Sequence, residues 1–419
     1  MIKKLVILVL MFGYLYALAF NIFLNSYFRF PTPLLFGIPL IALFWQRNQR
    51  FLYVREALVL FALNFLFFVV AQQDTKSAAV NLLVIVVVFL YFNFFVGIDN
   101  KRFKSSIILF YLLLTMSTLI MLANHVYRPQ IDSLRATLIG AEVGQSPAGI
   151  SSTIFSFGYQ LAALVSFLFI AAILFTRSWF IRIAVLMACL TAIYFGMQRS
   201  ALITFAVTSL VFLLLYYRFK AVPIIGLVVI VSLAFSPFFI TKSSGQYDNI
   251  FAKNERNAEQ DRSALVTENL NIYSNYPLGL MFYGKNWNDV TKYNKIYAGG
   301  LTSHNAYLMF LTYVGPFVGI TFLLLLYYKV GKIIKFVLTE IRDPKNALLV
   351  CLSLSFLAIS LNSMFHNASL IGAEGASVFI YFAILHRYNM QYGTEIIVEE
   401  KVQVIQKPFK KNTRLLSYE

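Results

Sequence analysis

Three side chains with distinct chemistries stand at the edges of long apolar or periodic segments. Arg199 occupies the short link between two apolar segments, and a planar guanidinium group binds phosphate or pyrophosphate with two hydrogen bonds. His304 directly precedes another apolar segment, and histidine is the common general base near neutral pH. Arg262 stands at the start of a polar segment with helical periodicity. Two cations and one base indicate a site that binds an anion and removes a proton, provided that the fold brings them together.

Each of these residues also has a simpler interpretation. Arg199 could anchor a helix end at the membrane surface, Arg262 could meet lipid headgroups, and His304 could cap a helix. Three further residues are expected to line a cleft beside them: Asn305, His366 and Glu374. No two histidines have the spacing of metal ligands on one helix, and there is no Gly-rich phosphate loop. We therefore expect neither a metal nor a cofactor.

The composition predicts the kind of protein that must position these groups. Of the 419 residues, 59% are hydrophobic and only 13% are charged, against about a quarter charged in soluble chains. The apolar residues form continuous blocks long enough to cross a hydrocarbon core of ~30 Å as helices. Because the backbone must satisfy its own hydrogen bonds in lipid, we expect an all-α membrane protein rather than a barrel of short alternating strands.

Twelve membrane-spanning helices are expected. They cover residues 4–24, 34–45, 55–71, 78–98, 107–123, 160–175, 183–197, 201–217, 223–241, 305–328, 348–365 and 376–388. The first span ends in Ala17-Leu18-Ala19, which is similar to a signal-peptidase site, but its apolar run continues, so a retained helix is the preferred interpretation. Cys189 and Cys351 both lie in apolar spans and are expected to be packing residues.

The net charge of +17 is explained by topology rather than by nucleic acid. With Lys3 and Lys4 on the cytoplasmic side, the loops alternate between the two sides of the membrane. Most of the 35 Lys and Arg residues then fall on the cytoplasmic side, including Lys329, which we place in a cytoplasmic loop. Both termini are then cytoplasmic. The domain organisation is a membrane domain over residues 1–390 and a basic cytoplasmic tail over 391–419, with membrane lipid as an expected partner and no nucleic acid.

Two long segments fall on the outer side, at about 124–159 and 241–304. A loop of about 60 residues is usually functional. Within the second loop, a helix is expected from Asp261, the N-cap, to the Asn275-Tyr276-Pro277 stop. Its stripe facing the membrane domain is expected to consist of six residues: Arg262, Leu265, Val266, Asn269, Leu270 and Tyr273.

About 130 residues, from Met197 to Phe322, resemble the O-antigen ligase and O-antigen polymerase superfamily of bacterial surface-polysaccharide assembly. The resemblance rests on the Gln198-Arg199-Ser200-Ala201 turn, a long outer loop with Arg262, the Tyr276-Pro277-Leu278-Gly279 and Tyr283-Gly284 elements, and His304-Asn305-Ala306-Tyr307-Leu308 followed by Gly315 and Gly319.

The resemblance implies a metal-independent, inverting glycosyltransferase in the bacterial inner membrane with a periplasmic active site. The donor would be a glycan on undecaprenyl pyrophosphate, and the acceptor either lipid A-core or a growing glycan. Arg199 and Arg262 match arginines that hold the pyrophosphate, and His304 matches the histidine thought to deprotonate the acceptor hydroxyl. A histidine away from this set, His386, is expected to be replaceable by alanine without effect.

The subtype stays open at this point. One branch of polymerases has a glycine eleven positions after an arginine in each large outer loop, whereas here Tyr273 follows Arg262 and Ile139 follows Arg128 at that spacing. This difference favours a ligase over a polymerase. Two other classes remain as alternatives: a transporter of lipid-linked oligosaccharides, which would need ionisable residues within its spans, and a structural membrane subunit, which would not bring Arg199, Arg262 and His304 together.

Overall fold

The computed structural model describes residues 2–23, 31–46, 51–143, 149–150, 154–223, 226, 262–300, 302–366 and 370–405. Every regular element in these ranges is helical, which confirms the expected all-α fold. Nine helices in the described part of the chain are long and apolar enough to cross a membrane. The protein is therefore a multi-pass membrane protein.

The helices of the first half are α1 (Ile2–Ala19), α2 (Thr32–Ala42), α3 (Val54–Asn64) with its π-helical extension (Phe65–Ala71), α4 (Thr75–Leu90) with a second such extension (Tyr91–Val96), α5 (Asn100–Asn124), α6 (Arg128–Ile139), α7 (Ile154–Phe175), α8 (Trp179–Gly196) and α9 (Arg199–Tyr217) with a short 3-10 turn (Arg218–Lys220). The second half contains α12 (Arg262–Asn275), a 3-10 turn (Leu280–Tyr283), α13 (Trp287–Thr291), another such turn (Lys295–Gly300), α14 (Ala306–Val314), α15 (Pro316–Thr339), a third turn (Pro344–Asn346), α16 (Ala347–Asn362) and α17 (Gly375–Ile405).

The expected spans correspond to these helices with three differences. The expected span 34–45 is the short helix α2, whose 11 residues include Pro39. At 1.5 Å per residue such a helix covers roughly half of a ~30 Å hydrocarbon core. The expected span 223–241 lies almost wholly outside the described residues. The expected span 376–388 lies within α17, in agreement with the prediction that this segment is helical.

The third difference concerns the expected span 305–328, which is two helices. Helix α14 ends at Val314, and α15 starts at Pro316 after Gly315, whose φ is +80°. Gly315 lies directly on the Leu278-Gly279 turn: a Cβ atom on Gly315 would stand 1.9 Å from the carbonyl oxygen of Leu278. Two sections of backbone thus meet with no room for a side chain, and this contact redirects the chain between α14 and α15.

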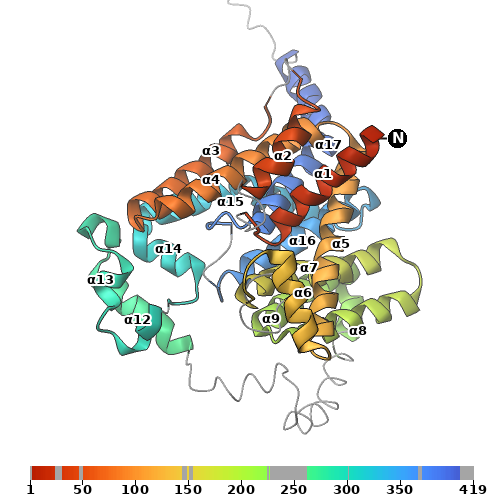
Figure 1. The fold of residues 1–419 in the computed structure, drawn as a ribbon. Helices are drawn as coiled ribbons and strands as arrows, with labels where there is room; N and C mark the ends of the chain where they lie inside the picture. Colours follow the sequence, from red (N-terminus) through yellow and green to blue (C-terminus); the bar gives the residue numbers. More distant parts are fainter. Residues whose placement is uncertain are drawn as a thin grey trace, which may run out of the picture.

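Helices α7 and α16 form the centre of the bundle, packed against each other and against α9, with α17 on the other side of α16 (Figure 1). Small polar side chains fill this contact: the Tyr111 hydroxyl donates to Ser355 Oγ at 2.7 Å, and Ser355 Oγ donates to the carbonyl of Ala163 at 2.9 Å. Small and hydroxyl residues allow close helix packing in lipid. Cys189 in α8 and Cys351 in α16 are buried, free thiols, as expected.

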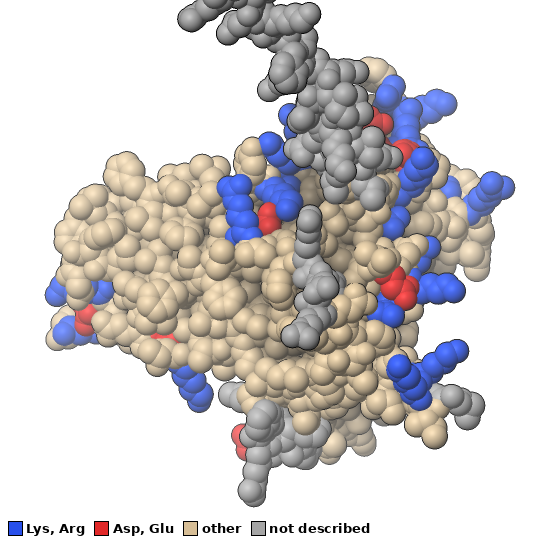
Figure 2. Space-filling model, turned by 90° about the horizontal axis from the view of Figure 1, so that it is seen from above, with Lys and Arg blue, Asp and Glu red and all other residues tan. Residues whose placement is uncertain are grey.

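Helices α12, α13 and α14 form a lobe at one edge of the molecule (Figure 1). The space-filling view shows Lys and Arg gathered on the right and near the centre, a smaller group at the left edge, and a wide area without charged side chains between the centre and that edge (Figure 2). A belt of uncharged surface between charged ends is what a lipid bilayer requires of a protein that spans it.

One ion pair joins two of the spanning helices, contrary to the expectation that Lys329 belongs to a loop. Lys329 is in the middle of α15, and its Nζ atom is 2.9 Å from Glu56 Oε1 on α3. Glu56 is buried, whereas nearly half of the Lys329 side chain is exposed. Lys329 ends the apolar run of the sequence but not the helix, because a lysine with a carboxylate partner and a long apolar stem is tolerated inside a helix.

Candidate functional site

Arg199 is the first residue of α9 and lies close to the end of α8. Only Met197 and Gln198 separate the two helices, and Met197 has a left-handed backbone with φ +52°. Arg199 is half-buried, while Gln198 and Ser200 on either side of it are buried. The structure thus places the guanidinium at a helix end, as the sequence predicts.

His304 and Asn305 begin α14. His304 is half-buried and has a left-handed backbone with φ +52°. The side chain of Asn305 is the N-cap, because its Oδ1 accepts a hydrogen bond from the Leu308 amide at 3.0 Å. Asn305 therefore fixes the start of the helix that presents His304.

His366 connects these two segments. Its backbone carbonyl, together with that of Ser363, accepts from the amide of Ala306 at 2.9 Å, and its Nε2 atom is 2.9 Å from Ser200 Oγ. One histidine thus bonds to the residue after Arg199 and to the second residue after His304. Since two residues span at most ~7 Å, the Cα of His304 lies within roughly 10 Å of the His366 carbonyl. The Arg199 and His304 turns are therefore neighbours in space.

His366 itself is buried and packs against the start of α7. A Cβ atom on Gly158 would stand 3.4 Å from His366 Nε2 and 2.7 Å from Gln198 Oε1. Gly158 thus allows α7 to approach both side chains closely. This arrangement makes His366 a positioning residue, because it holds the two turns together rather than presenting a free face.

A second polar group adjoins the first along α7. The Tyr159 hydroxyl donates to Glu374 Oε2 at 3.0 Å, and Asn21 Nδ2 donates to the same oxygen. Asn21 Oδ1 in turn accepts from the Gly375 amide at 2.9 Å, where α17 begins. Because Tyr159 follows Gly158, the Glu374 carboxylate and the His366 ring meet consecutive residues of one helix.

Burial raises the pKa of the Glu374 carboxyl, which lies just before α17, to about 7, while the hydrogen bonds from Tyr159 and Asn21 lower it. A carboxyl whose pKa is higher in the folded state than in the unfolded state binds its proton more tightly when folded. The folded protein therefore loses stability as the pH rises from about 4.5 to about 7, and above that range the loss is complete.

Strained backbone is concentrated around this site. Seven described non-glycine residues have positive φ, and four of them lie in the segments just described: Asn21, Met197, His304 and Ala373, the neighbour of Glu374. Left-handed backbone costs a residue with a Cβ atom about 1–2 kcal/mol, so it persists only where the surroundings impose it. Such positions cluster at functional sites.

Arg262 begins α12, and its side chain lies outside the described part of the chain, as do Asp261 and the rest of 227–261. The expected helix is confirmed, including its end at Asn275. Its buried face, however, consists of Leu265, Asn269 and Ile272, whereas Leu270 is 49% exposed. The buried face of α12 is therefore rotated relative to the expected stripe. A mostly polar helix of four turns has few apolar residues, so its sequence is only a weak guide to which face is buried.

Asn269 attaches α12 to the helix that carries His304. Its Oδ1 accepts from the Thr312 hydroxyl at 2.6 Å, and its Nδ2 is 3.2 Å from Met309 Sδ, both on α14. Asn269 is fully buried. The structure therefore positions the helix of Arg262 on the helix of His304, while the distance between the two side chains is outside what it describes.

Arg135 is a residue that the sequence reasoning missed. It is fully buried in α6, where its Nε donates to the Gly149 carbonyl at 2.8 Å and its Nη1 meets Asp132 at 3.0 Å. Burial lowers its pKa, while Asp132 raises it. The spacing of Asp132 and Arg135, one helical turn, was the available signal. Arg135 holds the segment between α6 and α7 against the bundle.

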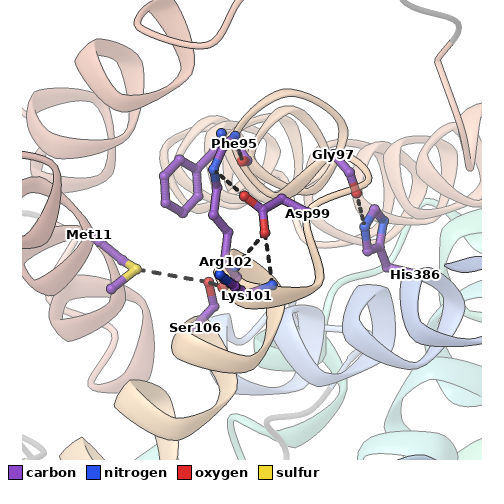
Figure 3. A network of polar contacts seen from close by, with 8 residues as sticks. All are labelled: Met11, Phe95, Gly97, Asp99, Lys101, Arg102, Ser106 and His386. Atoms are coloured by element: carbon purple, nitrogen blue, oxygen red, sulfur yellow. Dashed lines mark hydrogen bonds and ion pairs between the residues drawn. The ribbon is translucent and has the colours of Figure 1, made fainter. Parts of the chain in front are cut away.

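His386 is also buried, so we expect its replacement to lower stability, while the expectation that transfer is unaffected stays a prediction. Its Nε2 is 2.7 Å from the Gly97 carbonyl and its Nδ1 is 3.2 Å from the Tyr53 hydroxyl. The adjoining turn is held by Arg102, which pairs with Asp99 at 3.2 Å (Figure 3). His386 thus joins α17 to Gly97 and Tyr53, at the end of the bundle opposite His366.

No three His, Cys, Asp or Glu side chains among the described residues are grouped as metal ligands would be. No protein-family model matches the chain, and no curated protein is similar enough to be recognised as a relative.

Proposed function

We propose that this protein is an inverting glycosyltransferase that moves a glycan from undecaprenyl pyrophosphate to a sugar hydroxyl, with ligation of O-antigen to lipid A-core as the leading reaction. One observation carries the proposal: His366 joins the Arg199 turn to the His304 turn through two contacts of 2.9 Å. This proximity supports the pairing of an anion-binding arginine with a base that the sequence suggested.

The chemistry needs these two roles. The acceptor hydroxyl oxygen forms a bond to the anomeric carbon, while the bond from that carbon to the pyrophosphate oxygen breaks. His304 takes the hydroxyl proton, and undecaprenyl pyrophosphate leaves with its negative charge stabilised by Arg199 and Arg262. Fixed positive charge at the leaving group and a positioned base are two established ways in which enzymes accelerate a reaction.

The position of the site at a helix end suits such a donor. A polyprenyl chain remains in the bilayer, so its pyrophosphate is available only where helices meet the membrane surface. In the proposed topology, with both termini cytoplasmic, this surface is the periplasmic face of the bacterial inner membrane. The α12–α14 lobe would cover the acceptor.

The test is a gel of surface glycans from a strain that lacks the gene, complemented with the wild-type protein or with His304→Ala. Ligation predicts an uncapped lipid A-core band and polymerised glycan on undecaprenyl pyrophosphate. Polymerisation, the alternative use of the same site, predicts cores capped by a single repeat unit. An unchanged glycan ladder in the deleted strain would rule out both reactions.

The arginine roles are tested in the same strain with Arg199→Ala and Arg262→Ala, both expected to be nearly as severe as His304→Ala. Lys292→Ala is the matched control, because Lys292 is an exposed cation in the α12–α14 lobe whose ammonium lies 4.8 Å from the centre of the neighbouring Tyr293 ring. Loss of activity in the control as well would show that any missing charge disables the lobe, and the specific roles would be wrong.

A further inference from the structure

A cavity of about 370 Å³ lies between α3 and α15, in a part of the bundle to which the proposed reaction assigns no role. Its volume falls within the range of ~300–1,000 Å³ that ligand sites occupy. The side chain at its base, Tyr53, is held by His386, which bonds to Gly97 next to the start of α5. The cavity therefore lies toward the end of the bundle opposite His304 and Arg199.

The polar wall of the cavity carries excess positive charge. Arg55, Glu56 and Lys329 line it, and the pair of Lys329 with Glu56 at 2.9 Å is neutral. Arg55 is exposed and makes no ion pair with a residue that the structure describes. Lys332, one turn further along α15, lies 4.3 Å from the centre of the Tyr328 ring at the cavity edge. Arg55 thus remains available to an anion, and Lys332, whose partner Tyr328 is an uncharged side chain, adds a second positive charge at the cavity edge.

The remaining wall is apolar and open to the surroundings. Val54, Leu325 and Tyr328 line the cavity and are 44%, 38% and 54% exposed. Leu58, one turn along α3 from Val54, is 61% exposed. These residues continue the uncharged belt of the spanning helices, so the cavity opens where lipid chains meet headgroups.

We propose that this cavity binds the headgroup phosphate of an anionic phospholipid, with the acyl chains lying along α3 and α15. The Arg55 guanidinium and the Lys332 ammonium hold the phosphate, as arginine forks and lysine point charges do elsewhere. The Lys329–Glu56 pair and Tyr53 form the rigid floor. An apolar approach on one side and two cations on the other fit a lipid better than a free anion, which gains nothing from Val54 or Leu325.

The test is native mass spectrometry of the purified protein in detergent with phosphatidylglycerol, with phosphatidylcholine of the same chains, or with inorganic phosphate. Retained phosphatidylglycerol in the wild-type protein, and little of the other two, is expected. Each of Arg55→Gln and Lys332→Gln should reduce retention about 5-fold, as the loss of one cation near an anionic headgroup does. Both side chains are exposed, so these variants should fold normally.

Lys104→Gln is the matched control, because Lys104 is an exposed cation near the start of α5 that does not line the cavity, and the variant should retain lipid like the wild type. Equal retention by the two cavity variants and the wild type would overturn the proposal. Equal retention of phosphatidylcholine would show that the charge of the headgroup does not determine binding. Displacement of the lipid by inorganic phosphate would show that the ligand is a free anion. None of these outcomes depends on glycan transfer.

Discussion

Replacement of Gly315 by alanine tests whether the backbone contact at the α14–α15 break supports the site. Alanine would be held at φ +80°, which costs about 1–2 kcal/mol. Its Cβ would also stand 1.9 Å from the Leu278 oxygen and 2.6 Å from the Leu278 carbonyl carbon, and backbone atoms cannot rotate away. The two sections of chain must separate, which opens the packing of the buried Val314 and Leu280. We expect a total destabilisation of about 4 kcal/mol.

Two other glycines separate the cost of the backbone conformation from the cost of the steric contact. At Gly284, φ is +60° and no atom lies within 4 Å of a Cβ, so Gly284→Ala should cost only the backbone part, about 1 kcal/mol. Gly331 lies inside α15 with nothing near it, so Gly331→Ala should be neutral or stabilise by up to about 1 kcal/mol. The assay is the unfolding midpoint of each purified protein in one detergent. If Gly315→Ala has the same unfolding midpoint as Gly284→Ala, the steric contact contributes nothing and the reasoning is refuted.

Three further changes have defined outcomes. Ser200→Ala removes the partner of His366 Nε2 and should slow transfer about 10-fold at equal protein level; an unchanged rate would show that the contact positions nothing. Glu374→Gln should remove the loss of stability between pH 4.5 and about 7 and should be more stable than the wild type above pH 7 by roughly 3 kcal/mol. Thermal unfolding of this variant that keeps the wild-type dependence on pH would contradict the carboxyl assignment. His386→Ala should lower the unfolding midpoint, because the Gly97 carbonyl and the Tyr53 hydroxyl lose a partner at a cost of about 2 kcal/mol. Transfer per folded molecule should not change. An unchanged midpoint would show that this histidine is dispensable for stability.

The spanning helices were predictable because lipid leaves the backbone few alternatives. Continuous apolar blocks such as those of α5 and α7 can satisfy their hydrogen bonds only as helices. The end of α12 was predictable for a local reason, since Pro277 disfavours helix at Tyr276. Both features depend on neighbouring residues alone.

The division of the expected span 305–328 was not predictable in the same way. The apolar run continues across Gly315 and Pro316, and proline is also accepted in the first turn of a helix. The contact that imposes φ +80° on Gly315 comes from Leu278, 37 positions earlier, and residue spacing carries no signal for it.

The site was predictable in its residue types and less so in its construction. The sequence indicated that Arg199 and His304 both stand at helix starts, and they do. The bonds that bring them together run from the His366 carbonyl to the Ala306 amide and from the His366 ring to Ser200. One of these is a backbone bond, which any residue at position 366 could form, so its presence could not be read from side-chain types.

Transfer by the purified protein tests the central claim most directly. Wild-type protein and His304→Ala would be reconstituted into liposomes with an undecaprenyl-pyrophosphate-linked glycan and lipid A-core, and the glycan on lipid A-core measured over time. A positioned base contributes about 10²–10⁴ in rate, so His304→Ala should lose at least 100-fold while it unfolds at the wild-type temperature. A His304→Ala protein that transfers at the wild-type rate would contradict the assignment of the base, and a wild-type protein that transfers no glycan to any sugar hydroxyl would contradict the proposed function itself.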